Sequence, residues 1–293
     1  MRIVKTITLM LIMFIFIAVV VAASSQIMLR PHPGNYYENY KGFTDMIVGE
    51  WSARGQQFTT WQSQYVRKVT GWAVVGIIVL FALHMITVGR KELPAGGEEI
   101  PWYSLLNRVV HWLAAVSVSI LVITGLIMTF GKYLGGGAFV RFLRYVHGVV
   151  GIFTVLPVGV MLIMWAKDSV FRGYDITWLV RFGGYLSKSH EPLPAGKFNA
   201  GQKIWFWIST LSSIVMFYTG YLMFYFSATT DGLRTAALVH NILAVLLLVA
   251  FLGHLYMVLY IYSGALKSMI NGKKYEKTVQ FLYSEFYRKI KEG

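Results

Sequence analysis

Five long apolar runs limit this chain to one class of fold. They lie at residues 69–89, 109–131, 145–166, 204–226 and 235–266. Each exceeds the roughly 18 apolar residues that mark a membrane span, because about 20 helical residues at 1.5 Å each cross the hydrocarbon layer. Charged residues make up 14% of the chain, against about 25% in an ordinary soluble domain. The sequence therefore predicts an all-α integral membrane protein.

A shorter apolar run comes first, at residues 7–23. It follows a basic flank, Arg2 and Lys5, and ends in the small residues VAASS. These features are typical of a secretory signal peptide, so we predict one at residues 1–23, with an uncleaved N-terminal anchor as the alternative. Residues 24–68 would then form a periplasmic segment, and 69–89 an additional transmembrane helix.

The distribution of Lys and Arg predicts the orientation, since these residues gather in cytoplasmic loops. With the N-terminus inside, the inner segments hold 18 of the 27 Lys and Arg residues. Residues 90–106 become a cytoplasmic loop and 267–293 a cytoplasmic tail. The basic cytoplasmic segments then account for most of the net charge of +14. The sequence shows no basic soluble domain of the kind that binds nucleic acid. We expect a multi-pass protein of the bacterial cytoplasmic (inner) membrane.

Four histidines fall within the predicted spans at two depths. His147 and His240 lie near the outer face, whereas His111 and His254 lie near the inner face. The 14 residues from His240 to His254 return the side chain to within about 40° and advance it about 21 Å along the helix. Both imidazoles therefore face the same bundle interior. This arrangement predicts two stacked bis-histidine haem sites in a four-helix bundle.

The composition narrows the redox chemistry further. The chain has no cysteine, which excludes disulfides, iron–sulfur clusters and haem attached through a C-x-x-C-H motif. A single histidine in a span is often a packing residue, but four that match in depth and phase favour ligands. We expect a Ser or Thr near each pair to accept a hydrogen bond from the second ring nitrogen. His32, His84 and His190 have no matched partner, and His84 is predicted to be structural or a minor polar contact.

The loop sequence GKFNAGQK, residues 196–203, precedes the fourth long run. Its spacing predicts a helix start, with Asn199 as N-cap and Gln202 reaching back in a capping box. The amide groups of Asn199 and Gln202 and the exposed backbone at Gly201 would also suit a quinone carbonyl. The two interpretations are compatible. We find no convincing internal repeat in the sequence.

Six motifs in succession carry a family resemblance: NRVVHW, LRYVHGVVGI, GKFNAGQK, LVHNILAV, LGHLYMV and SGALKSMINGK. Together, over about residues 101–290, they resemble the cytochrome b (gamma) subunit of membrane-bound respiratory formate dehydrogenases. The resemblance implies a four-helix cytochrome b domain at 107–266. It also implies that His147 with His240, and His111 with His254, bind two b haems, and that menaquinone binds at Asn199, Gly201 and Gln202.

The function implied by this resemblance is electron transfer to menaquinone at the cytoplasmic side. The electrons would come from an iron–sulfur beta subunit and a molybdenum or tungsten catalytic alpha subunit, which oxidises formate elsewhere, so no catalytic residue is expected in this chain. One alternative is the cytochrome b subunit of a hydrogenase or another periplasmic oxidoreductase. A haem-free anchor or a proton-relay transporter is a different class, and the absence of Asp and Glu from the five runs counts against the transporter.

Overall fold

The computed structural model describes residues 41, 44–46, 53–188, 191–262 and 264–292 of the chain. The predicted signal peptide lies outside the described residues, as does most of the predicted periplasmic segment. Within the described part, five helices are long and apolar enough to cross a membrane. The prediction of an all-α, multi-span membrane fold is confirmed.

The first spanning helix is continuous from Arg54 to Thr87. It comprises α3 (Ala53–Thr60), a π-helical segment at Trp61–Val66, and α4 (Arg67–Thr87). The other four are α5 (Leu105–Thr129), α6 (Gly137–Trp165), α8 (Ala200–Tyr225) and α9 (Thr230–Tyr256). A second π-helical segment, Met257–Ile261, extends α9.

Side chains define where these helices begin. Ser104 caps α5 and exchanges hydrogen bonds with Asn107 in a capping box, and Asn199 and Gln202 do the same for α8. The Thr229 side chain accepts a hydrogen bond from the Gly232 N–H at the start of α9. These bonds satisfy backbone donors that the first helical turn leaves without partners.

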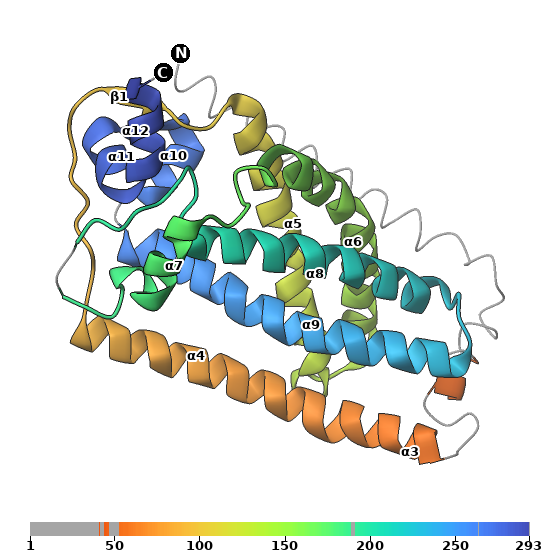
Figure 1. Cartoon of the computed structure of the whole chain (residues 1–293). Helices are drawn as coiled ribbons and strands as arrows, with labels where there is room; N and C mark the ends of the chain where they lie inside the picture. Colours follow the sequence, from red (N-terminus) through yellow and green to blue (C-terminus); the bar gives the residue numbers. More distant parts are fainter. Residues whose placement is uncertain (1–40, 42–43, 47–52, 189–190, 263, 293) are drawn as a thin grey trace.

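The helices pack in sequence-adjacent pairs, α5 with α6 and α8 with α9, and α6 joins the pairs through α8. Helix α4 lies along the outside of α9 (Figure 1). We call the end of the bundle near His147 and His240 the predicted outer end. The end near His111 and His254 is the predicted inner end.

A small unit covers the predicted inner end. It consists of α10 (Ala265–Asn271), α11 (Glu276–Leu282) and α12 (Ser284–Glu292), with strand β2 (Lys273–Tyr275) pairing antiparallel to β1 (Glu99–Pro101). Its base is an aromatic cluster in which Trp102 and Tyr283 of this unit meet Trp165 and Phe198 of the bundle side. The segment predicted as a tail is therefore folded against the bundle (Figure 1).

The connection between α6 and α8 contains a short helix, α7 (Gly173–Val180), and a 3-10 turn at Phe182–Gly184. Asp175 of α7 and Lys203 of α8 form an ion pair of 2.6 Å in which each side chain is 1% exposed. This contact fixes α7 beside the first turn of α8, where Asn199 and Gln202 form the capping box.

Candidate haem and quinone sites

The pair at the predicted outer end joins α6 to α9. The ring centroids of His147 and His240 are 6.2 Å apart. Metal–nitrogen bonds to histidine are about 2.0 Å long, so two imidazoles that share one iron have centroids about 6.3 Å apart. The spacing fits an iron between the two rings. The sequence prediction that these residues form a pair agrees with this geometry.

The pair at the predicted inner end joins α5 to α9. The ring centroids of His111 and His254 are 6.5 Å apart, which fits the same iron spacing. Neither pair has a third His, Asp or Glu within ligand distance among the described residues. Each pair therefore supplies two nitrogen ligands, the number that a haem iron takes from the protein in bis-histidine cytochromes.

At the predicted outer pair, the second ring nitrogen of each histidine meets a threonine. His147 Nδ1 lies 2.8 Å from Thr124 Oγ1, and His240 Nδ1 lies 3.0 Å from Thr219 Oγ1. Each threonine hydroxyl donates to a carbonyl of its own helix, so its oxygen accepts from the imidazole N–H. This fixes the proton on Nδ1 and leaves Nε2 of both rings free to bind iron.

The predicted inner pair has different surroundings. Nδ1 of His111 is buried and has no hydrogen-bond partner among the described residues. The indole of Trp205 stacks on His254, with ring centroids 4.9 Å apart and planes 12° from parallel. The expectation of a Ser or Thr acceptor thus holds for the His147 and His240 pair, whereas no such bond forms at His111 in the described part.

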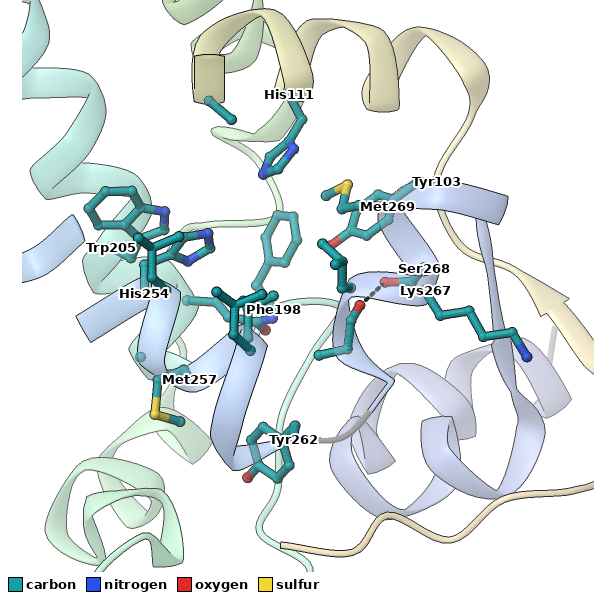
Figure 2. Close-up of a pocket in the computed structure, with 18 of the residues that line it drawn as sticks. Tyr103, His111, Phe198, Trp205, His254, Met257, Tyr262, Lys267, Ser268 and Met269 are labelled. Atoms are coloured by element: carbon teal, nitrogen blue, oxygen red, sulfur yellow. Dashed lines mark hydrogen bonds between the residues drawn. The ribbon is translucent and has the colours of Figure 1, made fainter. Parts of the chain in front are cut away.

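A cavity of about 910 Å³ opens at the predicted inner end. Figure 2 shows His111 entering it from α5, with His254 and Trp205 on another side of the space. Its lining also includes residues from the segments before α5 and α8, from the first turn of α8, from the chain between α9 and α10, and from α10 itself: Tyr103, Tyr185, Asn199, Gly201, Gln202, Tyr262 and Lys267. The inner histidine pair and the GKFNAGQK motif therefore border one continuous space.

The three residues predicted to bind quinone also have local structural roles. Asn199 and Gln202 exchange two hydrogen bonds of 3.0 and 2.9 Å as the predicted capping box, and the Gln202 amide donates to the Tyr283 hydroxyl at 3.4 Å. A Cβ on Gly201 would lie 2.6 Å from the Trp178 ring, so glycine there allows α7 to approach α8. Capping is confirmed, and quinone binding stays a prediction.

Two buried tyrosines outside the spans also line the cavity. Burial raises the pKa of Tyr103 and of Tyr185 well above the ordinary value for a phenol. Both hydroxyls are therefore protonated at neutral pH. The Tyr185 hydroxyl donates to the Tyr262 oxygen, whereas the Tyr103 hydroxyl can donate into the cavity.

His84, on α4, makes two hydrogen bonds. One ring nitrogen lies 2.8 Å from the Tyr256 hydroxyl and the other 2.8 Å from the Tyr185 carbonyl. The prediction of a structural or polar contact is confirmed for this residue. His32 and His190 lie outside the described residues.

Comparison with known proteins identifies the family. The family model described as prokaryotic cytochrome b561 matches residues 102–272. The chain belongs to this family. It is a multi-pass membrane b-type cytochrome of prokaryotic type, and membership of the family implies haem b.

Among similar proteins is the cytochrome b556(Fdn) subunit of the nitrate-inducible formate dehydrogenase of Escherichia coli K12. It is 26% identical over 203 residues, which cover 64% of this chain and 90% of that protein. The formate dehydrogenase cytochrome b556 subunit of Haemophilus influenzae is 26% identical over 176 residues, with 56% and 72% covered. A candidate cytochrome of E. coli K12, YdhU, is 29% identical over 241 residues, with 70% and 91% covered. The chain is therefore related to electron-transfer subunits of respiratory oxidoreductases.

Sequence reasoning did not find Thr124, Thr219 or Trp205. A signal for the threonines exists, because a Thr-Gly dipeptide occurs 23 residues before His147 and 21 residues before His240. The spatial counterpart is a repeat of helix pairs, α5 with α6 and α8 with α9, in which the first helix supplies the threonine and the second supplies the histidine.

Proposed function

We propose that this chain is the di-haem cytochrome b subunit of a formate dehydrogenase, which passes electrons from partner subunits to menaquinone. The observation that carries the proposal is the presence of two histidine pairs at iron-sharing distance, 6.2 and 6.5 Å between ring centroids. Both pairs use α9, which presents His240 and His254 to the same bundle interior.

His147 and His240 would hold one haem iron, and His111 and His254 would hold the other. When bound, the haems supply one-electron transfer across the apolar layer. The chain's own part is to fix ring orientation, which Thr124 and Thr219 do at one pair, and to keep water from the sites. Gly125 and Gly220 lie against these rings, since a Cβ at either position would be 3.5 Å from the histidine Cε1.

The cavity at the predicted inner end would receive the quinone. A quinone is a flat apolar ring with two carbonyl acceptors, and the lining combines Trp205 and Phe198 with the polar groups of Tyr103, Asn199 and Gln202. The protonated Tyr103 hydroxyl and the Gln202 amide would supply donors for the carbonyl oxygens. Since this cavity also borders His111 and His254, the quinone would lie beside the second haem.

Orientation and partners complete the proposal. The distribution of Lys and Arg supports an orientation in which the His147 and His240 end faces the periplasm and the cavity faces the cytoplasm. An iron–sulfur beta subunit and a molybdenum or tungsten catalytic alpha subunit would deliver electrons at the periplasmic face. The similarity to formate dehydrogenase subunits of E. coli and H. influenzae supports formate as the source of the electrons.

The test is a dithionite-reduced minus oxidised visible spectrum of the purified protein, with haem quantified as pyridine haemochrome. We expect two b haems per chain in the wild type, and one in His240→Ala and in His254→Ala. A folded wild-type protein that stays colourless when expressed with adequate haem would refute the cytochrome assignment and favour an anchor or a proton relay.

A second candidate is the cytochrome b subunit of a hydrogenase or other periplasmic oxidoreductase. The match to YdhU, which covers more of this chain than the formate dehydrogenase subunits do, favours keeping it. Purification of the native complex from its membrane, followed by mass spectrometry and an assay of formate-dependent quinone reduction, separates the candidates. If a hydrogenase subunit co-purifies, or if the complex does not reduce quinone with formate, the second candidate is favoured over formate dehydrogenase.

A further inference from the structure

The two histidine pairs differ in what contacts their second ring nitrogens. At His147 and His240, threonine oxygens lie 2.8 and 3.0 Å from Nδ1. Both threonines are buried, with Thr124 4% and Thr219 6% exposed, so water does not compete for these bonds. The arrangement occurs twice, once on α5 with α6 and once on α8 with α9.

The threonines are held ready to accept. The Thr124 hydroxyl donates to the Ile120 carbonyl at 2.7 Å, and the Thr219 hydroxyl donates to the Val215 carbonyl at 3.0 Å. A hydroxyl whose proton is committed to a carbonyl can only accept at its remaining lone pair. The imidazole N–H is therefore the donor in each histidine–threonine bond. Backbone carbonyls, that of Leu121 for His147 and that of Met216 for His240, also accept from these rings, so the threonine adds a second acceptor at each one.

The other pair lacks this support. Nδ1 of His111 is buried without an acceptor in the described part of the chain, and no hydrogen bond is formed by His254 among the described residues. The neighbour of His254 is the apolar face of Trp205. Its ring therefore receives stacking contacts in place of an acceptor.

Hydrogen bonding at the second nitrogen changes the electronic character of a ligand. An imidazole that donates its N–H to an oxygen gains partial negative charge and becomes a more basic ligand. A more basic ligand stabilises ferric over ferrous iron, which lowers the reduction potential. The pair with acceptors should therefore hold the iron of lower potential.

We infer that Thr124 and Thr219 set the direction of electron flow, by holding the potential of the haem at His147 and His240 below that of the haem at His111 and His254. This rests on the proposed function, in that the four histidines bind haem. Electrons then run downhill from the predicted outer end to the cavity that would receive the quinone. The two threonines are positioning residues, since they act on iron only through the histidines.

The experiment is a potentiometric titration of the haem absorption bands of the detergent-purified protein with its haems. The variants are Thr124→Val, Thr219→Val and the double variant, which keep the shape of the side chain and remove the hydroxyl acceptor, while the Leu121 and Met216 carbonyls remain. We expect the lower of two redox waves to rise in each, with a larger rise in the double variant, while the upper wave stays in place. A tenfold change in the ferric-to-ferrous preference corresponds to about 59 mV for one electron.

Control variants separate an effect on the haem reduction potential from an effect on side-chain packing. Thr124→Ser and Thr219→Ser keep a hydroxyl and should restore the wild-type potential. Thr154→Val on α6 and Thr210→Val on α8 replace buried threonines that bond to their own helix carbonyls, and we expect no shift in either wave. Titration of His240→Ala and His254→Ala assigns each wave to its pair.

The outcomes are distinct. A wild-type protein without haem would refute the proposed function itself. Two haems per chain with a lower wave that the valine variants leave in place would overturn only the threonine inference. A lower wave that belongs to the His111 and His254 pair would overturn it as well, because the assigned direction of flow would be reversed.

Discussion

The buried ion pair between Asp175 and Lys203 gives the sharpest prediction about stability. The carboxylate accepts from the Lys203 ammonium at 2.6 Å and from the Arg172 backbone N–H at 2.7 Å. Lys203 also lies over the Tyr174 ring, 5.1 Å from its centroid. Two unit charges 2.6 Å apart, as in the Asp175–Lys203 pair, attract by about 6 kcal/mol at an effective dielectric constant of about 20. Removal of one partner leaves the other charge buried alone.

Lys203→Met and Asp175→Asn should therefore each lower the free energy of unfolding by about 3–5 kcal/mol. For a domain of this size that corresponds to a fall of about 10 °C in the midpoint of thermal unfolding. The double variant replaces both charges with neutral side chains of similar volume. It should recover most of the loss, because neither charge is then left without its partner.

The assay is thermal unfolding in detergent, followed by tryptophan fluorescence. Lys197→Met is the matched control, because Lys197 pairs with Asp168 at 3.5 Å while 25% exposed, and such pairs contribute about 0–1 kcal/mol. Single variants that unfold at the wild-type temperature would refute the reasoning. A double variant less stable than either single variant would also refute it.

Two further changes test the packing around the cofactor sites. Gly148→Ala would place a Cβ 2.3 Å from ring carbons of Phe224, so we expect less haem at the adjacent histidine pair by pyridine haemochrome, whereas Gly159→Ala on the same helix, with no atom within 4 Å, should keep both haems. His84→Phe removes the hydrogen bond to the Tyr185 carbonyl, and we expect weaker binding of a quinone analogue in a fluorescence titration with haem content unchanged. Full haem in the first variant, or unchanged affinity in the second, would contradict these expectations.

The spans could be predicted from the sequence because apolar length alone decides them. A run of about 20 apolar residues has few alternatives to a transmembrane helix, since backbone polar groups must bond within the segment. The residues at which the spans end were harder to predict. The fifth run extends to residue 266, but the helix stops at Ile261 and α10 begins at Ala265, because Gly264, in a left-handed conformation with φ 88°, separates them.

The folded C-terminal unit could not be predicted in the same way. Residues 267–293 are polar and basic, so their pattern indicates a tail. What holds them is tertiary: β2 pairs with β1, and Tyr283 packs on Trp102 with ring centroids 4.7 Å apart. Strand and aromatic partners separated by more than 170 residues leave no local signal.

The histidine pairs were accessible because depth and helical phase follow from residue number. The threonines that accept hydrogen bonds from these histidines could not be predicted in this way. Thr124, which contacts His147, lies on another helix. The sequence of a single span does not distinguish it from Ser and Thr residues that bond only to their own helix carbonyls, such as Thr154 and Thr210. Only the repeat of the Thr-Gly dipeptide before two ligands would have indicated its role.

The additional helix α4 lies outside the region that the family model matches, which begins at residue 102, yet it contacts a residue that lines the same cavity. His84 joins α4 to the Tyr185 carbonyl and to the Tyr256 hydroxyl, and the Lys91 ammonium donates to the Ser187 carbonyl. Tyr185 lines the cavity, and Tyr256 comes two residues after His254. Because the Tyr185 contact joins α4 to one wall of the cavity, we predict that substitutions at His84 change the predicted quinone site through a helix that the family model does not include.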